Sequence, residues 1–188
     1  MRAFETRLVE AKVWTAQEHS GPSEKVRKGA REMILFLDFD GVLHPDAVYL
    51  EKRGPVLRAP GELFMWAGLL EDALAPHPDL KIVLSTSWVR FRSFSRTRKA
   101  LPSRLQSRVI GATWHSRTDP VEWRELSRYQ QIRRYLSRTS PTEWLALDDD
   151  DEAWGENDRY RLILTDPSQG IGKQDTLTDF REKLASCK

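Results

Sequence analysis

Cysteine is almost absent from this chain of 188 residues, which has a single thiol at Cys187. One thiol cannot form an internal disulfide, which excludes a disulfide-stapled secreted domain and favours a reducing compartment. Apolar runs of membrane-spanning length are also lacking, and the first residues contain no apolar signal-peptide core. We therefore expect a cytoplasmic protein without a membrane segment.

Acidic residues are missing from one long stretch of the chain. Residues 81–118 contain nine Lys or Arg residues and no Asp or Glu, although the net charge of the whole chain is only +2. Trp88, Phe91 and Phe94 are interleaved with the first of these basic residues. Such a basic block suits anionic substrates or a nucleic-acid backbone. The simpler interpretation is a solvated helix face that pairs with acidic residues elsewhere, and we favour it.

What the chain does contain is typical of one globular domain. Hydrophobic residues make up 39% and charged residues 31% of the 188 positions, and this length can bury a substantial core. Residues 1–31 include a polar linker rich in Lys and Arg, and we expect there either an N-terminal extension, partly helical or disordered, or a partner-binding arm. The globular domain is expected at residues 32–188.

An apolar run at residues 34–37 predicts a short strand buried on both faces. It leads directly into Asp38 and Asp40 and ends at Gly41. Burying ionised carboxylates is costly without a partner, and a hard divalent cation is a natural one. An ordinary surface turn is the alternative, because Asp and Gly are common turn residues.

Two further apolar runs end in polar clusters. Residues 80–84 lead into Ser85 and Thr86, and residues 142–147 lead into a run of carboxylates that begins with Asp148 and Asp149. Between the first two strands we expect a loop at residues 45–60 and a helix at residues 61–74. Strand, helix, strand is the parallel crossover unit, whose ligands gather at the carboxyl ends of the strands.

The remaining elements complete an α/β fold. A short strand is expected at residues 109–113, a helix from about residue 120 or 126 to residue 136, a last strand at residues 160–165 and a closing helix at residues 176–184. The predicted architecture is a Rossmann-like parallel sheet flanked by helices.

The apolar run followed by Asp38-Phe39-Asp40-Gly41-Val42 resembles the first motif of the haloacid dehalogenase-like (HAD) phosphohydrolases. The resemblance implies that Asp38 is the phosphoryl-accepting nucleophile and that Asp40 is the general acid and base. It also implies that a hydroxyl after the second strand binds the phosphoryl group. Thr86 fits that role, with Ser85 as the alternative, and Gly41 is expected beside the substrate.

Two further motifs of the same family have matches here. Its third motif is a basic residue near the start of a helix, which matches Arg128, with Arg124 as the alternative. Its fourth motif is a pair of Asp residues after an apolar strand, which matches Asp148 and Asp149. The resemblance implies Mg²⁺ bound by Asp38, Asp40 and this pair, with Asp149 favoured as the direct ligand.

Residues 40–45, 85–88 and 147–149 also resemble a small subgroup of HAD domains associated with RNA-repair proteins, in which His44 has no assigned role. The short spacing between the motifs implies a member with no cap or a minimal one. The expected function is Mg²⁺-dependent hydrolysis of a phosphate ester through an aspartyl-phosphate. The alternatives are a phosphatase acting on nucleic-acid ends, a nucleic-acid-binding module that uses the basic block, and a non-catalytic domain that binds phosphorylated ligands.

Overall fold

A computed structural model describes residues 33–115 and 118–187, and the extension expected at residues 1–31 lies outside this part of the chain. Five parallel strands form the central sheet in the order β5-β4-β1-β6-β7. Their bounds are β1 Met33–Leu37, β4 Lys81–Leu84, β5 Val109–Ala112, β6 Glu143–Asp148 and β7 Leu162–Leu164. The expected Rossmann-like α/β sheet is thereby confirmed.

The two faces of the sheet are buried in separate apolar layers. On β1, Leu35 and Leu37 face one layer while Ile34 and Phe36 face the other. Alternate residues of a strand point to opposite faces, so a strand covered on both sides must be apolar throughout. This explains why the apolar run of β1 shows no polar alternation.

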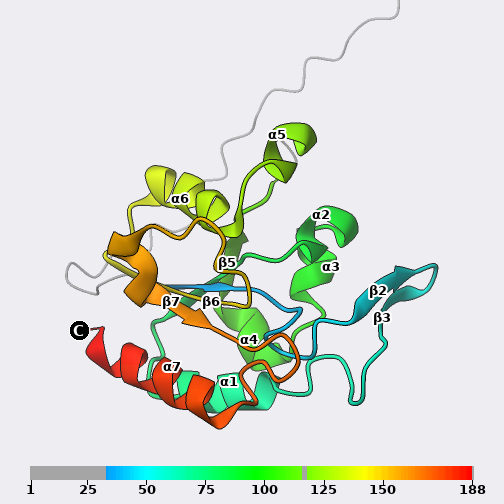
Figure 1. The fold of residues 1–188 in the computed structure, drawn as a ribbon, viewed down its shortest axis with the longest axis horizontal. Helices are drawn as coiled ribbons and strands as arrows, with labels where there is room; N and C mark the ends of the chain where they lie inside the picture. Colours follow the sequence, from blue (N-terminus) through cyan, green and yellow to red (C-terminus); the bar gives the residue numbers. More distant parts are fainter. Residues whose placement is uncertain (1–32, 116–117, 188) are drawn as a thin grey trace, which may run out of the picture.

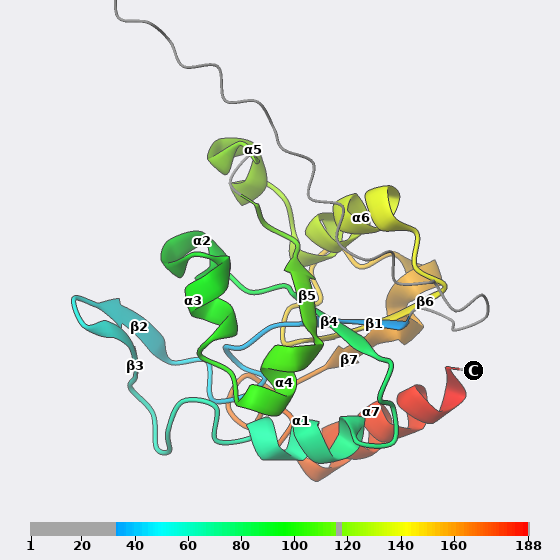
Figure 2. The ribbon, with the colours of Figure 1, turned by 180° about the vertical axis from the view of Figure 1, so that it is seen from behind.

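Helices cover both faces of the sheet (Figures 1 and 2). In Figure 1, α1 and α7 lie below the sheet and α6 lies above it. The helix expected from residue 120 or 126 is in fact two helices, α5 and α6. The helix bounds are α1 Ala67–Leu74, α2 Trp88–Arg92, α3 Phe94–Arg98, α4 Ser103–Arg108, α5 Pro120–Arg124, α6 Arg128–Thr139, the 3₁₀ helix η1 Glu156–Arg161 and α7 Gln174–Ser186.

The expected helix at residues 61–74 was wrong at its beginning, because α1 starts only at Ala67. Gly61 and Phe64 have φ angles of 112° and 63°, which are incompatible with a right-handed helix. The Phe64 N–H donates a hydrogen bond to Nδ1 of His44 at 3.2 Å. The residues before α1 therefore wrap around this buried imidazole instead of forming a helical turn.

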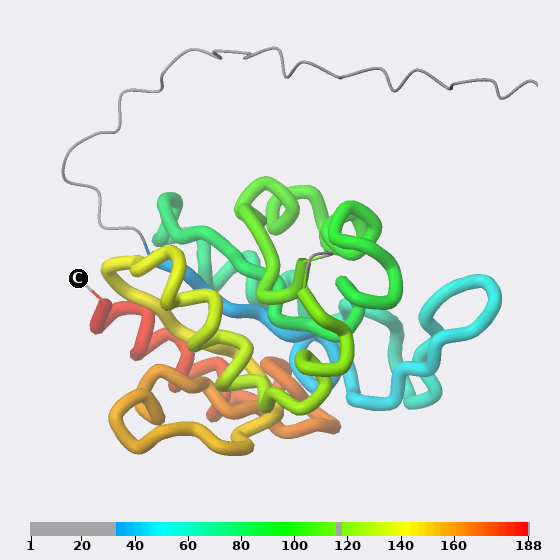
Figure 3. The backbone as a smooth tube through the Cα atoms, turned by 90° about the horizontal axis from the view of Figure 1, so that it is seen from above, coloured from blue at the N-terminus to red at the C-terminus, as the bar shows by residue number. Residues whose placement is uncertain are grey.

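The expected loop at residues 45–60 was also wrong, because it contains an antiparallel hairpin of β2 (Val48–Glu51) and β3 (Gly54–Leu57). Figure 3 shows this hairpin, in cyan, projecting beyond the rest of the chain. It is the one strand pair outside the central sheet in the described residues. An insertion this small agrees with the expectation of no cap or a minimal one.

The order of the strands fixes where a ligand can bind. From β1 the chain passes to β4 and β5 on one side, and then crosses to β6 and β7 on the other. The crevice at the carboxyl ends of β1 and its neighbours is the topological switch point, where ligands of open α/β sheets bind. None of the helices in the described part of the chain has the length and apolar character that a bilayer span requires.

Candidate active site at the carboxyl ends of the strands

Three neighbouring strands deliver acidic and hydroxyl side chains to the switch point. Asp38 directly follows β1, Asp148 is the last residue of β6, and Thr86 lies two residues beyond β4. Backbone hydrogen bonds keep the extended chain in register past the strand ends, from Asp38 N–H to Leu147 O at 3.1 Å and from Ser85 N–H to Leu37 O at 2.8 Å. The parallel sheet therefore brings residues distant in sequence to one edge.

Asp38 is buried and closely held. Its Oδ1 accepts a hydrogen bond from the Phe39 N–H at 2.7 Å, and its Oδ2 accepts one from Nη2 of Arg128 at 2.9 Å. The side chain of Thr86 also hydrogen-bonds to this carboxylate. Such fixed donors orient the carboxylate without removing all of its lone pairs.

Arg128 links the two neighbouring strand ends. Its Nε lies 3.1 Å from Oδ2 of Asp148, which is an ion-pair distance, although the N–H is not aimed well enough for a hydrogen bond. Arg128 is the first residue of α6, where Ser127 and Gln130 form a reciprocal capping box. That cap fixes the start of the helix and thereby aims the guanidinium into the site. Burial opposes its charged form, but Asp38 and Asp148 more than offset this and raise the pKa of Arg128.

Asp38, Asp148 and Asp149 form a carboxylate cluster, with one oxygen of each within 4.8 Å of the others. Burial raises the pKa of both Asp38 and Asp148, and Arg128 only partly counteracts it. Burial, together with the negative charges of Asp38 and Asp46, raises the pKa of Asp149 to about 7. One guanidinium does not balance three carboxylates. The excess of negative charge and the oxygen donors suit a hard divalent cation.

Gly41 makes room for this cluster. Its φ angle is 67°, and a Cβ at this position would lie 2.2 Å from Oδ2 of Asp149. Both the left-handed backbone and the close approach of the carboxylate require glycine. The Gly41 carbonyl is anchored by the Thr165 hydroxyl at 2.7 Å. Gly41 therefore shapes the site by letting Asp149 approach the turn after β1.

Asp40 lies outside the carboxylate cluster, and its carboxylate is held by different partners. The indole Nε1–H of Trp88 lies 3.0 Å from both of its oxygens, and Nε2 of His44 lies 3.0 Å from Oδ1. Because Nδ1 of His44 accepts the Phe64 N–H, the proton of the neutral ring is on Nε2. His44 therefore donates to Asp40.

The alternatives left open by the sequence differ in their surroundings. Ser85 is fully buried and its hydroxyl makes no hydrogen bond among the described residues, whereas Thr86 contacts Asp38. Arg128 reaches two carboxylates, whereas Arg124 is the last residue of α5 and lies at the edge of a nearby cavity. The geometry favours Thr86 and Arg128.

Trp88 and the partners of His44 were not found by sequence reasoning. Trp88 follows Thr86 by two residues, and His44 follows Asp40 by four. A buried Trp usually needs a hydrogen-bond partner for its indole N–H, and this requirement was the one sequence signal that Trp88 contacts a polar group. The identity of that partner depends on tertiary contacts across 48 residues of sequence.

A polar cavity of about 260 Å³ opens beside Thr86 and Arg128. Arg90 and Arg124 line it, together with Trp114 and Trp123. Other members of the basic block have structural contacts: Arg108, for example, donates to the carbonyls of His77 and Leu74. Among the described residues, no Lys or Arg of the block forms an ion pair with a carboxylate. The pairing with distant acidic residues that we favoured is therefore not seen.

Comparison with known proteins agrees with this geometry. No curated protein and no solved structure matches the chain. A family model described as the HAD domain in Swiss Army Knife RNA repair proteins matches residues 34–176, which include all but the first residue of β1, the strands β4 and β6, and every candidate site residue. The chain therefore belongs to this family of HAD domains.

Proposed function

We propose that the protein is a Mg²⁺-dependent phosphoric monoester hydrolase that works through an aspartyl-phosphate. The observation that carries this proposal is the meeting of Asp38, Asp148 and Asp149 with one arginine at the switch point. A HAD domain makes phosphohydrolase chemistry the expected class. A domain that only binds phosphorylated ligands would need neither a strand-end nucleophile nor a second carboxylate beside it.

The carboxylate cluster is the proposed metal site. Asp38, Asp148 and Asp149 would hold Mg²⁺, whose preference for oxygen ligands matches this set. The carboxylate of Asp40 is held outside this cluster by Trp88 and His44, so Asp40 is not part of the proposed metal site. When bound, Mg²⁺ would neutralise the repulsion between the carboxylates and an incoming phosphate and polarise a phosphoryl oxygen.

In the first proposed step, a carboxylate oxygen of Asp38 forms a bond to phosphorus while the bond from phosphorus to the ester oxygen breaks. The leaving oxygen takes a proton from the Asp40 carboxyl. In the second step, water attacks phosphorus and gives a proton to Asp40. The bond between phosphorus and Asp38 then breaks, which releases phosphate and restores both carboxyl groups.

Thr86 and Arg128 are the proposed phosphate-holding residues. Both already contact Asp38, so they surround the position at which a phosphoryl group would be attached. Their donors would stabilise the equatorial oxygens, where charge accumulates in the transition state. Ser85 has no such access, because its side chain is fully buried.

The test is hydrolysis of a panel of phosphate monoesters by the wild-type protein and by Asp38→Asn. The amide keeps the size of the side chain but cannot act as the nucleophile, so turnover should be lost while the fold is kept. The same panel without divalent cation should show no turnover. Retained hydrolysis in a pure Asp38→Asn preparation would contradict the assignment.

A phosphate at a nucleic-acid end is the second candidate substrate. The cavity beside Thr86 is lined by Arg90 and Arg124 and by two tryptophans, which suits a backbone phosphate and a stacked base. RNA repair in the name of the matched family points the same way. Affinity for a phosphorylated oligonucleotide should then fall steeply with salt, because phosphate contacts release counterions. A salt-independent affinity would favour a small phosphate ester.

A further inference from the structure

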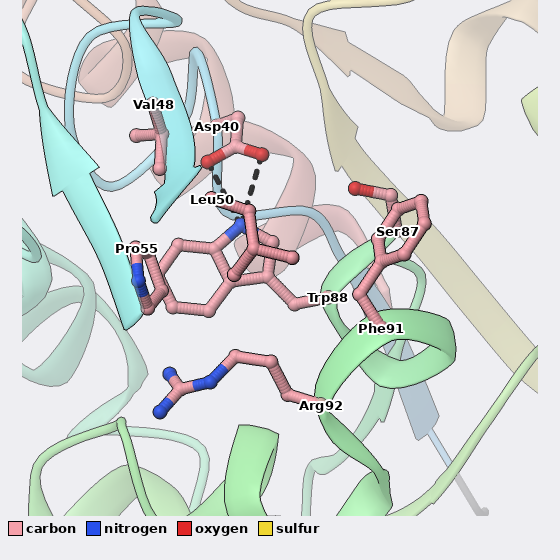
Figure 4. A pocket seen from close by; sticks show the side chains of 8 residues that line it. All are labelled: Asp40, Val48, Leu50, Pro55, Ser87, Trp88, Phe91 and Arg92. Atoms are coloured by element: carbon pink, nitrogen blue, oxygen red, sulfur yellow. Dashed lines mark hydrogen bonds between the residues drawn. The ribbon is translucent and has the colours of Figure 1, made fainter. Parts of the chain in front are cut away.

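A second cavity lies on the other side of Asp40, between the β2–β3 hairpin and α2. Its volume is about 120 Å³. Figure 4 shows the residues that line it, which are Asp40, Val48, Leu50, Pro55, Ser87, Trp88, Phe91 and Arg92. None of the proposed nucleophile, metal-binding or phosphate-binding side chains is among them. The cavity is therefore distinct from the phosphate site, although Ser87 lines both this cavity and the one beside Thr86.

Five of the eight residues that line this cavity are apolar. Val48 and Leu50 are alternate residues of β2 and so share one face of the hairpin, where Leu50 pairs with Pro55 of β3. Trp88 and Phe91 face them from α2. Leu50 is 60% exposed and Phe91 is 59% exposed. The large apolar side chains of Leu50 and Phe91 are thus exposed to solvent at the opening of this cavity, next to Asp40.

Asp40 connects this cavity to the chemistry. The dashed lines in Figure 4 join its carboxylate to the Trp88 indole N–H, at 3.0 Å for each oxygen. Under the proposed function, Asp40 gives its proton to the ester oxygen of the leaving group. The atoms bonded to that oxygen must therefore lie beside Asp40. The lining of the cavity determines which leaving groups fit.

We propose that this cavity binds a single aromatic ring attached close to the ester oxygen of the substrate. The inference rests on the proposed function and adds a substrate class to it. A cavity of 150 Å³ lined by apolar residues holds one benzene molecule in a well-studied case, and the volume here is about 120 Å³ with an open side. The guanidinium of Arg92 lies over the Trp88 ring, 5.5 Å from its centre, and also lines the cavity, so a guest ring would have a cation beside it.

The first experiment compares hydrolysis of benzyl phosphate, cyclohexylmethyl phosphate and ethyl phosphate. All three have primary alcohols as leaving groups, so the chemical step is matched and the ring is the main difference. Two to three buried methylene equivalents correspond to roughly a 15- to 60-fold higher kcat/KM for the benzyl ester than for the ethyl ester. The cyclohexylmethyl ester should fall between them, because it lacks the attraction of an aromatic face to Arg92. Equal kcat/KM for all three esters would overturn the proposal.

Variants of the hairpin localise the effect. Leu50→Ala should reduce the benzyl preference to about a third or less of its wild-type value, and Leu50→Trp should abolish it by filling the cavity. Val56→Ala is the matched control, because Val56 is exposed, lies on β3 and does not line the cavity. A benzyl preference that is unchanged in both Leu50 variants, or lost equally in Val56→Ala, would place the ring elsewhere.

A binding measurement separates this inference from the proposed function. Calorimetry with Mg²⁺ present compares 2-phenylethylphosphonate with propylphosphonate, the uncleavable analogues of the benzyl and ethyl esters. Tighter binding of the phenyl compound that is lost in Leu50→Trp supports the cavity even if no ester is hydrolysed, in which case only the hydrolase proposal fails. Hydrolysis of all esters without any difference in phosphonate affinity leaves the hydrolase proposal intact and refutes the ring site.

Discussion

Replacing Arg128 by Met tests whether the site is held together by charge. Arg128 is the only cation within ion-pair distance of Asp38 and Asp148 among the described residues, at 2.9 and 3.1 Å. Both carboxylates are almost fully buried, with side-chain exposures of 6% and 0%. Methionine keeps the hydrophobic stem and a similar helix propensity, so the substitution removes mainly the charge.

The expected cost depends on pH. Removing one partner of a buried ion pair costs about 3–5 kcal/mol, because the remaining charge stays buried. Without Arg128, the already raised pKa values of Asp38 and Asp148 rise further, since burial then lacks its main opposing influence. A raised pKa in the folded state gives stability that is present at low pH and lost as pH rises. We therefore expect the full cost at pH 8 and about 1–2 kcal/mol at pH 5.5, where only hydrogen bonds are lost.

Urea unfolding followed by tryptophan fluorescence, with EDTA present, measures this difference. Arg134→Met is the matched control on the same helix, because Arg134 pairs with Glu122 at 2.8 Å through side chains that are 38% and 55% exposed. Exposed pairs contribute about 0–1 kcal/mol. A loss for Arg128→Met that matches this control, or that is equal at the two pH values, would refute the electrostatic account of the site.

Three further outcomes are expected. Without divalent cation, the contribution of Asp149 to stability should fall by about 1.3 kcal/mol between pH 5 and pH 8, because its pKa is raised to about 7 and the partly solvated carboxylate keeps roughly half of the full effect. In thermal unfolding, the fall of Asp149→Asn should be smaller than that of the wild type by this amount. His44→Phe should lower kcat about tenfold or more with little change in KM, because the hydrogen-bond donor to the charged Asp40 is lost. Steady-state kinetics measure both constants, and a change in KM alone would contradict the view that His44 positions Asp40. Neutralising Arg90, Arg92 and Arg96 together should reduce hydrolysis of an oligonucleotide phosphate more than hydrolysis of a small phosphate ester, and the difference should shrink at high salt. An equal response of both substrates would mean that the basic block is only a solvated face.

The strands and their polar ends could be predicted because a parallel sheet imposes a simple pattern. A strand covered on both faces is apolar throughout, so β1, β4 and β6 stand out as apolar runs. Parallel strands point the same way, so the residues that follow them share one edge. Asp38, Thr86 and Asp148 were therefore expected to be neighbours before any contact was known.

The β2–β3 hairpin and the beginning of α1 could not be predicted in the same way. The hairpin strands are four residues each and none of these residues is buried, so they show little apolar periodicity, and Pro55 disfavours a strand. The apolar residues at positions 63, 64 and 66 fit a helix by spacing, yet Phe64 adopts a left-handed backbone beside His44. Tertiary contacts with a buried imidazole outweighed local preference there.

The choice between Arg128 and Arg124 had a local signal that was not used. Ser127 followed three residues later by Gln130 is a capping-box pattern, and it marks Arg128 as the first residue of a helix. By contrast, the two donors to Asp40 come from residues whose proximity depends on how α2 and the turn after β1 pack together. No sequence spacing specifies that packing.

The most direct test of the central claim is to trap the phosphoryl group on Asp38. Asp40→Asn should still be phosphorylated by an aryl phosphate, whose leaving group needs no proton, but should release phosphate slowly because no base activates water. Acid quenching followed by peptide mass spectrometry should then show one added phosphoryl group, sensitive to hydroxylamine, on the peptide that contains Asp38. Hydrolysis of the ester with no phosphoryl group on that peptide, or with the group on another residue, would contradict the account.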